Sequence, residues 1–142
     1  MTIRLTTGHV RVIEDHARET FPEECCGFLL GRPGERKEVD EVERTRNVVK
    51  TDRERRYVIE PREILRVDRE AREAGREILG FYHSHPDHPA RPSHFDEAHA
   101  TWPGYSYVIL SIVDGNPNDL RSWVLEKEGG PFHAETLSIT AE

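Results

Sequence analysis

The sequence predicts an α/β protein in which a mixed β-sheet is flanked by helices, and two observations support this fold class. Helical and strand patterns alternate up to about residue 100, whereas only strand patterns and turns follow. The strongest strand pattern, residues 105–113, is rich in aromatic and β-branched side chains, which favour a sheet. Because 142 residues suffice for one core, we expect residues 1–142 to form a single domain.

The first helix and the strands after it follow from hydrophobic spacing and turn residues. Thr6 or Thr7 is suited to cap a helix that runs to about residue 20 with one apolar face. We expect a buried strand at residues 24–30, an exposed strand at 37–49 and a short strand at 57–59. These strands form the first half of the predicted sheet.

Proline, glycine and serine mark the remaining boundaries. Pro61 is suited to the first turn of a second helix, which Gly75 ends. Ser93 is suited to cap a third helix that ends at about residue 100. The remaining strands are expected, in chain order, at residues 77–85, 105–113, 120–127 and 132–139, with a turn at 114–118.

Charge and hydropathy argue against two broad classes of partner. The chain has 20 Lys and Arg against 27 Asp and Glu, a formal net charge of -7. The basic residues alternate with acidic ones, as in residues 66–73, which is typical of a solvated helix face rather than of a basic patch for nucleic acid. No apolar run is long enough to span a membrane, and the N-terminal residues lack a signal-peptide core. We therefore expect a cytoplasmic protein that binds neither nucleic acid nor membrane. Its oligomeric state does not follow from the sequence.

Two histidines two residues apart are the most informative feature of the chain. His83 and His85 fall on the predicted strand 77–85, where residues i and i+2 point to the same face, so both imidazoles can reach one metal ion. Asp96 follows after a proline-rich loop and can supply a third ligand if that loop turns back. Three nitrogen and oxygen ligands with one open position are typical of a catalytic zinc site rather than a structural one.

Taken singly, each part of this pattern has a structural alternative. With 8 His in the chain, one pair can arise by chance, and Ser93 and Asp96 also form a good helix start. Taken together, His83-Ser84-His85, seven further residues, Ser93 and then Asp96 resemble the JAMM motif of the JAB/MPN zinc metallopeptidase family. The resemblance implies that His83, His85 and Asp96 bind Zn²⁺. It also implies one JAB/MPN-like domain, a curved mixed sheet flanked by helices, with the metal site at one edge.

The family motif also includes a glutamate well upstream. Residues 24–31, Glu-Cys-Cys-Gly-Phe-Leu-Leu-Gly, resemble the strand that carries it, with Glu24 in the position of the acid. Glu23 is the rival, but it is one residue out of register and faces the other side of the predicted strand. The resemblance makes Glu24 the general base and acid, which takes a proton from water and returns it to the leaving amine. It makes Ser93 a hydroxyl donor to the oxyanion that forms at the scissile carbonyl.

Several other polar residues are expected to be structural. Ser84 points away from the two histidines on the strand. Cys25 and Cys26 are adjacent in a predicted buried strand, so we expect small hydrophobic side chains there rather than a disulfide or a nucleophile. Arg91, two residues before Ser93, is either a contact for the incoming substrate or a solvated surface residue. His88, His94 and His99 lie near the site in sequence and are either contacts of the ligands or substrate or ordinary surface residues, of which we expect the latter, and we expect Trp102 and Trp123 to pack in the core or on the surface.

The substrate follows from the resemblance alone. The chain resembles the short prokaryotic branch of the family, because only eight residues separate Asp96 from Tyr105 and leave no room for the insertions of the large eukaryotic members. This implies hydrolysis of the bond after the C-terminal Gly-Gly of a ubiquitin-like or sulfur-carrier protein. Two alternatives stay open: a non-catalytic MPN scaffold that binds partner proteins, and a zinc amidohydrolase that acts on a small molecule.

Overall fold

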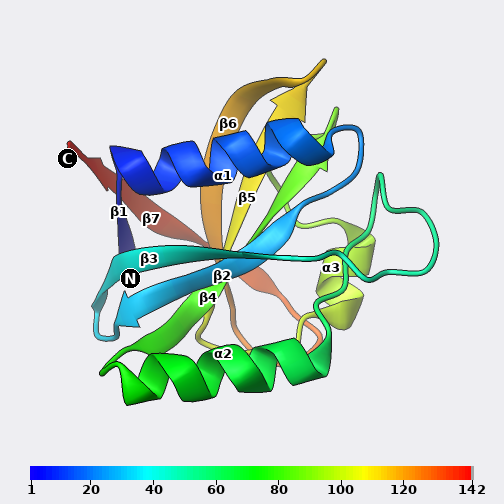
Figure 1. The fold of residues 1–142 in the computed structure, drawn as a ribbon. Helices are drawn as coiled ribbons and strands as arrows, with labels where there is room; N and C mark the ends of the chain where they lie inside the picture. The colour runs from blue at the N-terminus through cyan, green and yellow to red at the C-terminus, as the bar shows by residue number, and fades with distance from the viewer. Residues whose placement is uncertain (142) are drawn as a thin grey trace.

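A seven-stranded sheet with three helices around it is formed by residues 1–141, which are the residues that the computed structural model describes (Figure 1). The helices are α1 (Thr7–Thr20), α2 (Pro61–Glu73) and α3 (His94–His99). The strands are β1 (Thr2–Thr6), β2 (Cys26–Arg32), β3 (Arg36–Thr45), β4 (Glu77–Pro86), β5 (Ser106–Val113), β6 (Asn116–Leu125) and β7 (Phe132–Thr140).

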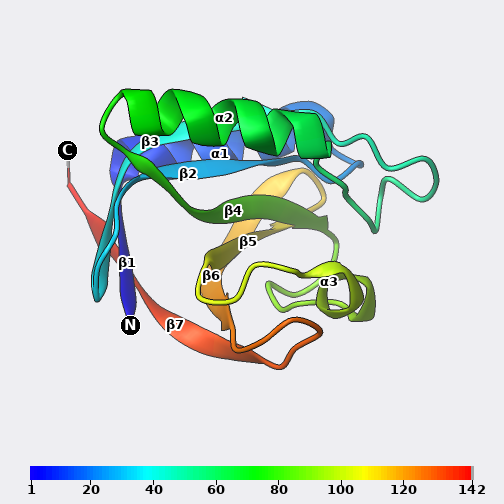
Figure 2. The same ribbon diagram turned by 90° about the horizontal axis from the view of Figure 1, so that it is seen from below.

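The sheet is mixed and closes on itself. Its order is β1-β3-β2-β4-β5-β6-β7, and parallel pairing of β1 with β7 closes it into a barrel. β1 also runs parallel to β3, and β4 runs parallel to β5, whereas the other neighbours are antiparallel. Figure 2 shows the strands from β4 to β7 curving away from α2 and round toward β1. The predicted curved mixed sheet with flanking helices is confirmed, and its closure is the feature that the sequence did not predict.

The two longer helices cover opposite sides of β2 and β3 (Figure 1). Ile13 of α1 belongs to one cluster of buried residues together with Leu29 of β2, and Val67 of α2 belongs to a second cluster together with Phe28 of the same strand. Because successive strand residues face opposite sides, β2 is covered on both faces. Each fully buried side chain of this size stabilises the fold by about 1.5–3 kcal/mol. This double burial explains the continuous apolar run from which the strand was predicted.

Both long helices begin and end as their residues predict. Thr6 caps α1, with its hydroxyl accepting a hydrogen bond from the main-chain N–H of His9 at 3.1 Å. Pro61 is the first residue of α2, and Gly75, with φ of 79°, follows its C-terminal end. These local signals are confirmed because capping depends on contacts within a few residues of the chain.

Several strand predictions were wrong. Residues 57–59, predicted as a short strand, have no regular secondary structure, because the Asn47 side chain rather than a neighbouring strand accepts the N–H of Val58. The first predicted strand begins at Cys26 instead of residue 24, and the second ends at Thr45 instead of residue 49. The strand predicted at 120–127 begins at Asn116, inside the predicted turn, since the β5–β6 pairing extends to that residue.

The first strand was not predicted at all. Ile3 and Leu5 are fully buried and alternate with half-buried residues, so β1 carries the two-residue period of a strand. It is only five residues long, and its partners β3 and β7 lie far along the chain. A signal this short is decided by long-range pairing rather than by local propensity.

The strand that carries the histidine pair is not an edge strand. β4 is hydrogen-bonded to β2 on one side and to β5 on the other. The position at one sheet edge that the family resemblance implied is therefore wrong for this closed sheet. The site lies beside an interior strand, where the backbone is held from both sides.

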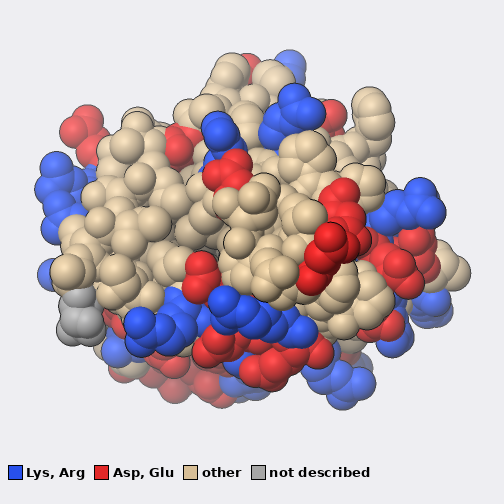
Figure 3. All heavy atoms as spheres, turned by 90° about the horizontal axis from the view of Figure 1, so that it is seen from above, with Lys and Arg blue, Asp and Glu red and all other residues tan. Residues whose placement is uncertain are grey.

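On the face that Figure 3 shows, Lys and Arg side chains lie beside Asp and Glu side chains. Surface ion pairs such as Arg44–Glu19 and Arg66–Glu70 join neighbouring basic and acidic side chains. Within residues 1–141, none of the helices combines the length and the hydropathy needed to cross a lipid bilayer. The cytoplasmic location stays a prediction.

Candidate metal centre

Strand β4 places His83 and His85 side by side. The main chain of His83 lies opposite Cys26 of β2 and Ile109 of β5. The Nε2 atoms of the two imidazoles are 3.1 Å apart, and both side chains are buried. Burial is the main cause that lowers the pKa of His83, which favours the neutral imidazole that a metal ligand requires.

The short helix α3 brings Asp96 back to the histidines. Ser93 caps this helix: its Oγ accepts the N–H of Asp96 at 3.0 Å, and Oδ2 of Asp96 accepts the N–H of Ser93 at 2.9 Å. The same Oδ2 lies 3.2 Å from Nε2 of His83 and 3.0 Å from Nε2 of His85. The helix-start pattern and the ligand pattern seen in the sequence are therefore two properties of the same pair of residues.

The three side chains fit a metal ion. Their ligand atoms all lie within 4.8 Å of one another. Around a tetrahedral zinc ion with bonds of about 2.0–2.1 Å, neighbouring donor atoms lie about 3.3 Å apart, close to the separations of 3.0–3.2 Å among His83, His85 and Asp96. Nδ1 of His85 lies 2.8 Å from the carbonyl of Pro89, to which it donates, so the lone pair of Nε2 faces the group.

Asp96 is the anionic member of this group. Burial by itself raises the pKa of its carboxyl, but the adjacent imidazoles of His83 and His85 outweigh burial and hold the pKa well below its usual range. Its second oxygen, Oδ1, is buried and has no hydrogen-bond partner among residues 1–141. A buried carboxylate beside two imidazoles is the donor set expected for a divalent cation.

Glu24 lies close to this group, just before β2. It is buried, whereas Glu23 is exposed. The next main-chain N–H, that of Cys25, donates to Oγ of Ser84 at 2.8 Å, which supports the structural role expected for that serine. Oε1 of Glu24 has no hydrogen-bond partner in the described part of the chain. Burial, followed by the negative charge of Asp96, raises the pKa of Glu24 to about 10.

Asn47 holds the main chain around Glu24, and sequence reasoning missed it. Its Nδ2 donates to the carbonyls of Glu24 at 3.2 Å and Arg56 at 2.9 Å, and its Oδ1 accepts the N–H groups of Val49 and Val58, both at 3.1 Å. This side chain thus makes four hydrogen bonds, which fill its usual capacity. The sequence signal is only an asparagine in a segment without periodicity, which looks like an ordinary turn residue.

A pocket of about 430 Å³, most of whose lining residues are polar or charged, opens beside His85. It contains Glu24, His85 and Ser93 together with two arginines, Arg55 and Arg91. Its remaining lining residues are His88, Pro89 and Pro92. The structure therefore brings Arg91, which the sequence analysis left undecided, next to the residues expected to carry the chemistry.

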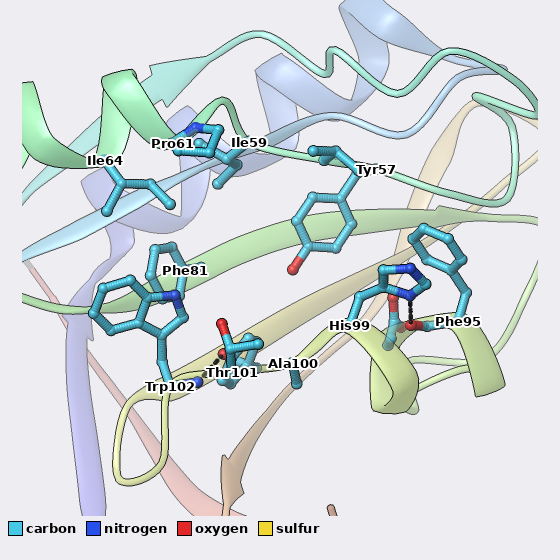
Figure 4. Close-up of a pocket in the computed structure, with 13 residues that line it drawn as sticks. Tyr57, Ile59, Pro61, Ile64, Phe81, Phe95, His99, Ala100, Thr101 and Trp102 are labelled. Carbon is cyan, nitrogen blue, oxygen red and sulfur yellow. Dashed lines mark hydrogen bonds between the residues drawn. The ribbon is translucent and has the colours of Figure 1, made fainter. Parts of the chain in front are cut away.

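A second pocket, of about 240 Å³, is largely apolar and touches the site through Asp96. Figure 4 shows the rings of Tyr57, Phe81 and Trp102 around it, contributed by three separate segments of the chain. The Tyr57 ring also stacks on His83, with ring centroids 4.3 Å apart. Trp102 thus lines a pocket instead of only packing in the core.

The other polar candidates do not enter the metal centre. Burial raises the pKa of Cys25 to about 12, so this thiol stays protonated and is no nucleophile at neutral pH. His88 and His99 each line one of the two pockets, and His94 is exposed. Trp123 donates from Nε1 to the carbonyl of Ala90 at 3.0 Å and so anchors the loop between the ligands.

Two imidazoles and one carboxylate gathered within reach of one ion, with a buried carboxyl nearby, form the arrangement typical of a metal-dependent hydrolase. The family model for prokaryotic homologues of the JAB domain matches residues 6–126. The chain belongs to this family, and the family predicted from the motif is confirmed.

Relatives of characterised function are similar over most of the chain. The desampylase of Haloferax volcanii is 37% identical over 103 residues, which are 70% of this chain and 73% of that protein. The CysO-cysteine peptidase of Mycobacterium tuberculosis is 35% identical over 134 residues, 87% of this chain and 88% of that protein. The solution structure of a protein from Desulfitobacterium hafniense superposes with a TM-score of 0.85 at 32% identity and covers 100% of this chain and 94% of that one.

Proposed function

We propose that this protein is a zinc peptidase that hydrolyses the bond after the C-terminal Gly-Gly of a ubiquitin-like or sulfur-carrier protein. The observation that carries the proposal is the convergence of His83, His85 and Asp96 next to the buried Glu24. The desampylase and the CysO-cysteine peptidase among the relatives support the class of substrate.

In this proposal His83, His85 and Asp96 hold the zinc ion. A zinc ion held there would supply Lewis acidity that acidifies water and polarises a carbonyl oxygen, and its charge would favour the ionised form of Glu24. Glu24 accepts a proton from the attacking water and returns it to the leaving amine. Its Oε1 makes no hydrogen bond within residues 1–141 that would compete with this task.

Ser93 supplies a hydroxyl donor on the rim of the same pocket. Its oxygen accepts the N–H of Asp96 at the helix cap, and this leaves the hydroxyl proton available for donation. The proton is offered to the oxyanion that forms at the scissile carbonyl. Capping and catalysis therefore use different parts of one hydroxyl group.

The activity is tested with the zinc-loaded chain and a fusion protein. The fusion joins each ubiquitin-like protein with a Gly-Gly terminus encoded in the same genome to a single alanine. Mass spectrometry is expected to show release of alanine directly after the second glycine. If none of the fusions is cut, the peptidase proposal fails. Turnover of small amides in their place would favour a zinc amidohydrolase, and binding without turnover would favour a scaffold.

The metal is tested separately. We expect one zinc ion per chain in protein purified without chelator, because His83, His85 and Asp96 form one set of ligands. The substitution His83→Ala is expected to remove the metal, whereas His94→Ala, which changes an exposed histidine, is expected to retain it. Elemental analysis checks both. Absence of zinc after reconstitution of the wild-type chain would contradict the proposal.

A further inference from the structure

The pocket that contains Glu24 is lined by two arginines and is called the cationic pocket below, whereas the pocket that touches Asp96 is lined mainly by aromatic and aliphatic side chains and is called the apolar pocket. Arg55 and Arg91 line the first pocket, and the two pockets share no lining residue. The two sides of a scissile bond at the metal centre therefore meet different surroundings. This asymmetry bears on which part of a substrate lies on which side.

The position of Glu24 indicates which side of the scissile bond faces which pocket. In the proposed reaction the C–N bond breaks, the carbonyl carbon gains the hydroxyl of water, and the leaving nitrogen gains a proton through Glu24. The leaving nitrogen must come within hydrogen-bond reach of that carboxyl. Because Glu24 lines the pocket with the two arginines and not the apolar one, the proposed proton transfer requires the leaving nitrogen to approach the pocket with the two arginines.

The two arginines of the cationic pocket make little use of their charge within the fold. Arg91 is exposed and forms no ion pair within residues 1–141, and Arg55 has only a long contact of 3.7 Å with Asp52. The loop that carries Arg91 is anchored on both sides of it. The carbonyl of Ala90 accepts the Nε1–H of Trp123 at 3.0 Å, and Ser93 is fixed in the cap of α3. A guanidinium placed in this way is suited to a carboxylate.

We infer that the cationic pocket binds the free α-carboxylate of a single leaving amino acid, with Arg91 as the main specificity-determining residue and Arg55 as the second. The α-carboxylate lies two bonds from the leaving nitrogen, so it enters the pocket together with that nitrogen. An isopeptide bond to a lysine side chain places an aliphatic chain there and leaves the arginines without a partner. The inference rests on the proposed peptidase function and adds the preferred leaving group.

The test compares leaving groups on one carrier. The carrier that is cut in the activity assay is prepared with alanine, with alaninamide and with an isopeptide-linked lysine peptide after its Gly-Gly. We expect kcat/KM for the free acid to exceed that for the amide and the isopeptide by about 10-fold or more, as charge-assisted hydrogen bonds to a carboxylate provide. In Arg91→Gln the preference for the acid over the amide is expected to fall toward one, and Arg91→Lys is expected to retain part of it.

Arg11→Gln is the matched control, since Arg11 is exposed on α1 and has no ion pair within the described residues. It is expected to keep the wild-type preference, and zinc content is measured for every variant. Equal cleavage of acid and amide by the wild type would overturn the inference, as would full preference in the double variant Arg55→Gln/Arg91→Gln.

A binding measurement separates this inference from the peptidase proposal. Fluorescence anisotropy compares the acid-ended and amide-ended fusions on the zinc-loaded Glu24→Gln protein. If the wild type cuts no fusion but the acid-ended fusion binds more tightly, the peptidase proposal fails and the carboxylate pocket stands. Equal binding of the two fusions would overturn the inference that this pocket binds a carboxylate.

Discussion

Glu24 and Glu23 are adjacent acids that the fold places in opposite environments. Glu24 is buried and lines one pocket with His85, whereas Glu23 is exposed. The regular strand begins only at Cys26, yet hydrogen bonds made by the side chains of Ser84 and Asn47 hold the main chain just before it. The choice of Glu24 over Glu23 by strand alternation agrees with this burial, while the catalytic role stays a prediction.

Exchanging each glutamate for glutamine distinguishes the role of Glu24 from that of Glu23. Glu24→Gln is expected to lower kcat on the order of 10²-fold or more, because a group that carries protons is lost while the shape of the side chain is kept. Glu23→Gln is expected to have wild-type activity. Steady-state kinetics and zinc content are measured for both variants. A large loss in Glu23→Gln together with an active Glu24→Gln would contradict the proposed role.

At the scale of the secondary-structure elements, contacts of α1, α3 and β2 with β4 position the histidine pair. Helix α3 has six residues, too short to be stable alone, and its cap and its contact with β4 both depend on Asp96. Helix α1 contacts β4 through His16, whose Nδ1 shares a hydrogen bond of 2.7 Å with the hydroxyl of Tyr82. A Cβ at Gly27 would overlap the Tyr82 ring, so glycine is required there for the ring to lie against β2. Strand β4, which carries the histidine pair, is therefore held by contacts with α1, α3 and β2.

The contact between α1 and β4 predicts a pH dependence of stability. Burial, the largest cause, lowers the pKa of His16 to about 4. In the unfolded chain the pKa is about 6.5, so between these values the unfolded state binds a proton that the folded state does not. Stability is therefore expected to fall as pH drops from about 6.5 to about 4, by on the order of 3 kcal/mol from this group.

The variant His16→Asn isolates this contribution, because asparagine can still bond Tyr82 but does not titrate. Urea unfolding at about pH 7, 6, 5 and 4 gives the free energy of unfolding of both proteins. The variant is expected to lose less stability than the wild type on acidification. Parallel pH profiles for the two proteins would show that His16 does not titrate as its burial implies.

At the scale of the whole molecule, the closed sheet encloses a buried ion pair. Nζ of Lys37 on β3 donates to Oε2 of Glu135 on β7 at 3.3 Å, to the carbonyl of Gly104 at 2.9 Å and to Oγ of Ser106 at 2.7 Å. Oε1 of Glu135 accepts the hydroxyls of Ser106 at 2.6 Å and Ser122 at 2.8 Å. The charges are satisfied by groups from β3, β5, β6 and β7, so the network depends on closure.

Removing one partner of this pair is expected to be costly. Lys37→Met leaves the carboxylate of Glu135 buried without a cation, which is expected to lower the free energy of unfolding by about 3–5 kcal/mol. The double variant Lys37→Met/Glu135→Leu is expected to recover most of that loss, since no unpaired charge remains. Urea unfolding measures all three proteins. Arg121→Met, which breaks the exposed Arg121–Asp119 pair, is the control and is expected to stay near wild type. A double variant that is no more stable than Lys37→Met would contradict this account.

The sequence by itself determined the features whose physics is local. Cap residues set the starts of α1 and α3, because their side chains bond to main-chain groups three residues on, and Pro61 favours the start of α2 through its fixed φ. The spacing of His83, His85 and Asp96 indicated a metal site, since strand alternation and one capped helix are enough to bring them together.

Only the tertiary structure decided the features that depend on distant parts of the chain. Closure of the sheet requires β1 to pair with β3 and β7, and a five-residue strand carries too little local preference to show it. The hydrogen bond from Asn47 to the carbonyl of Glu24 and the pairing of Lys37 with Glu135 join segments far apart in the sequence. Such contacts form only once folding has brought their partners together, so no local sequence pattern predicts them.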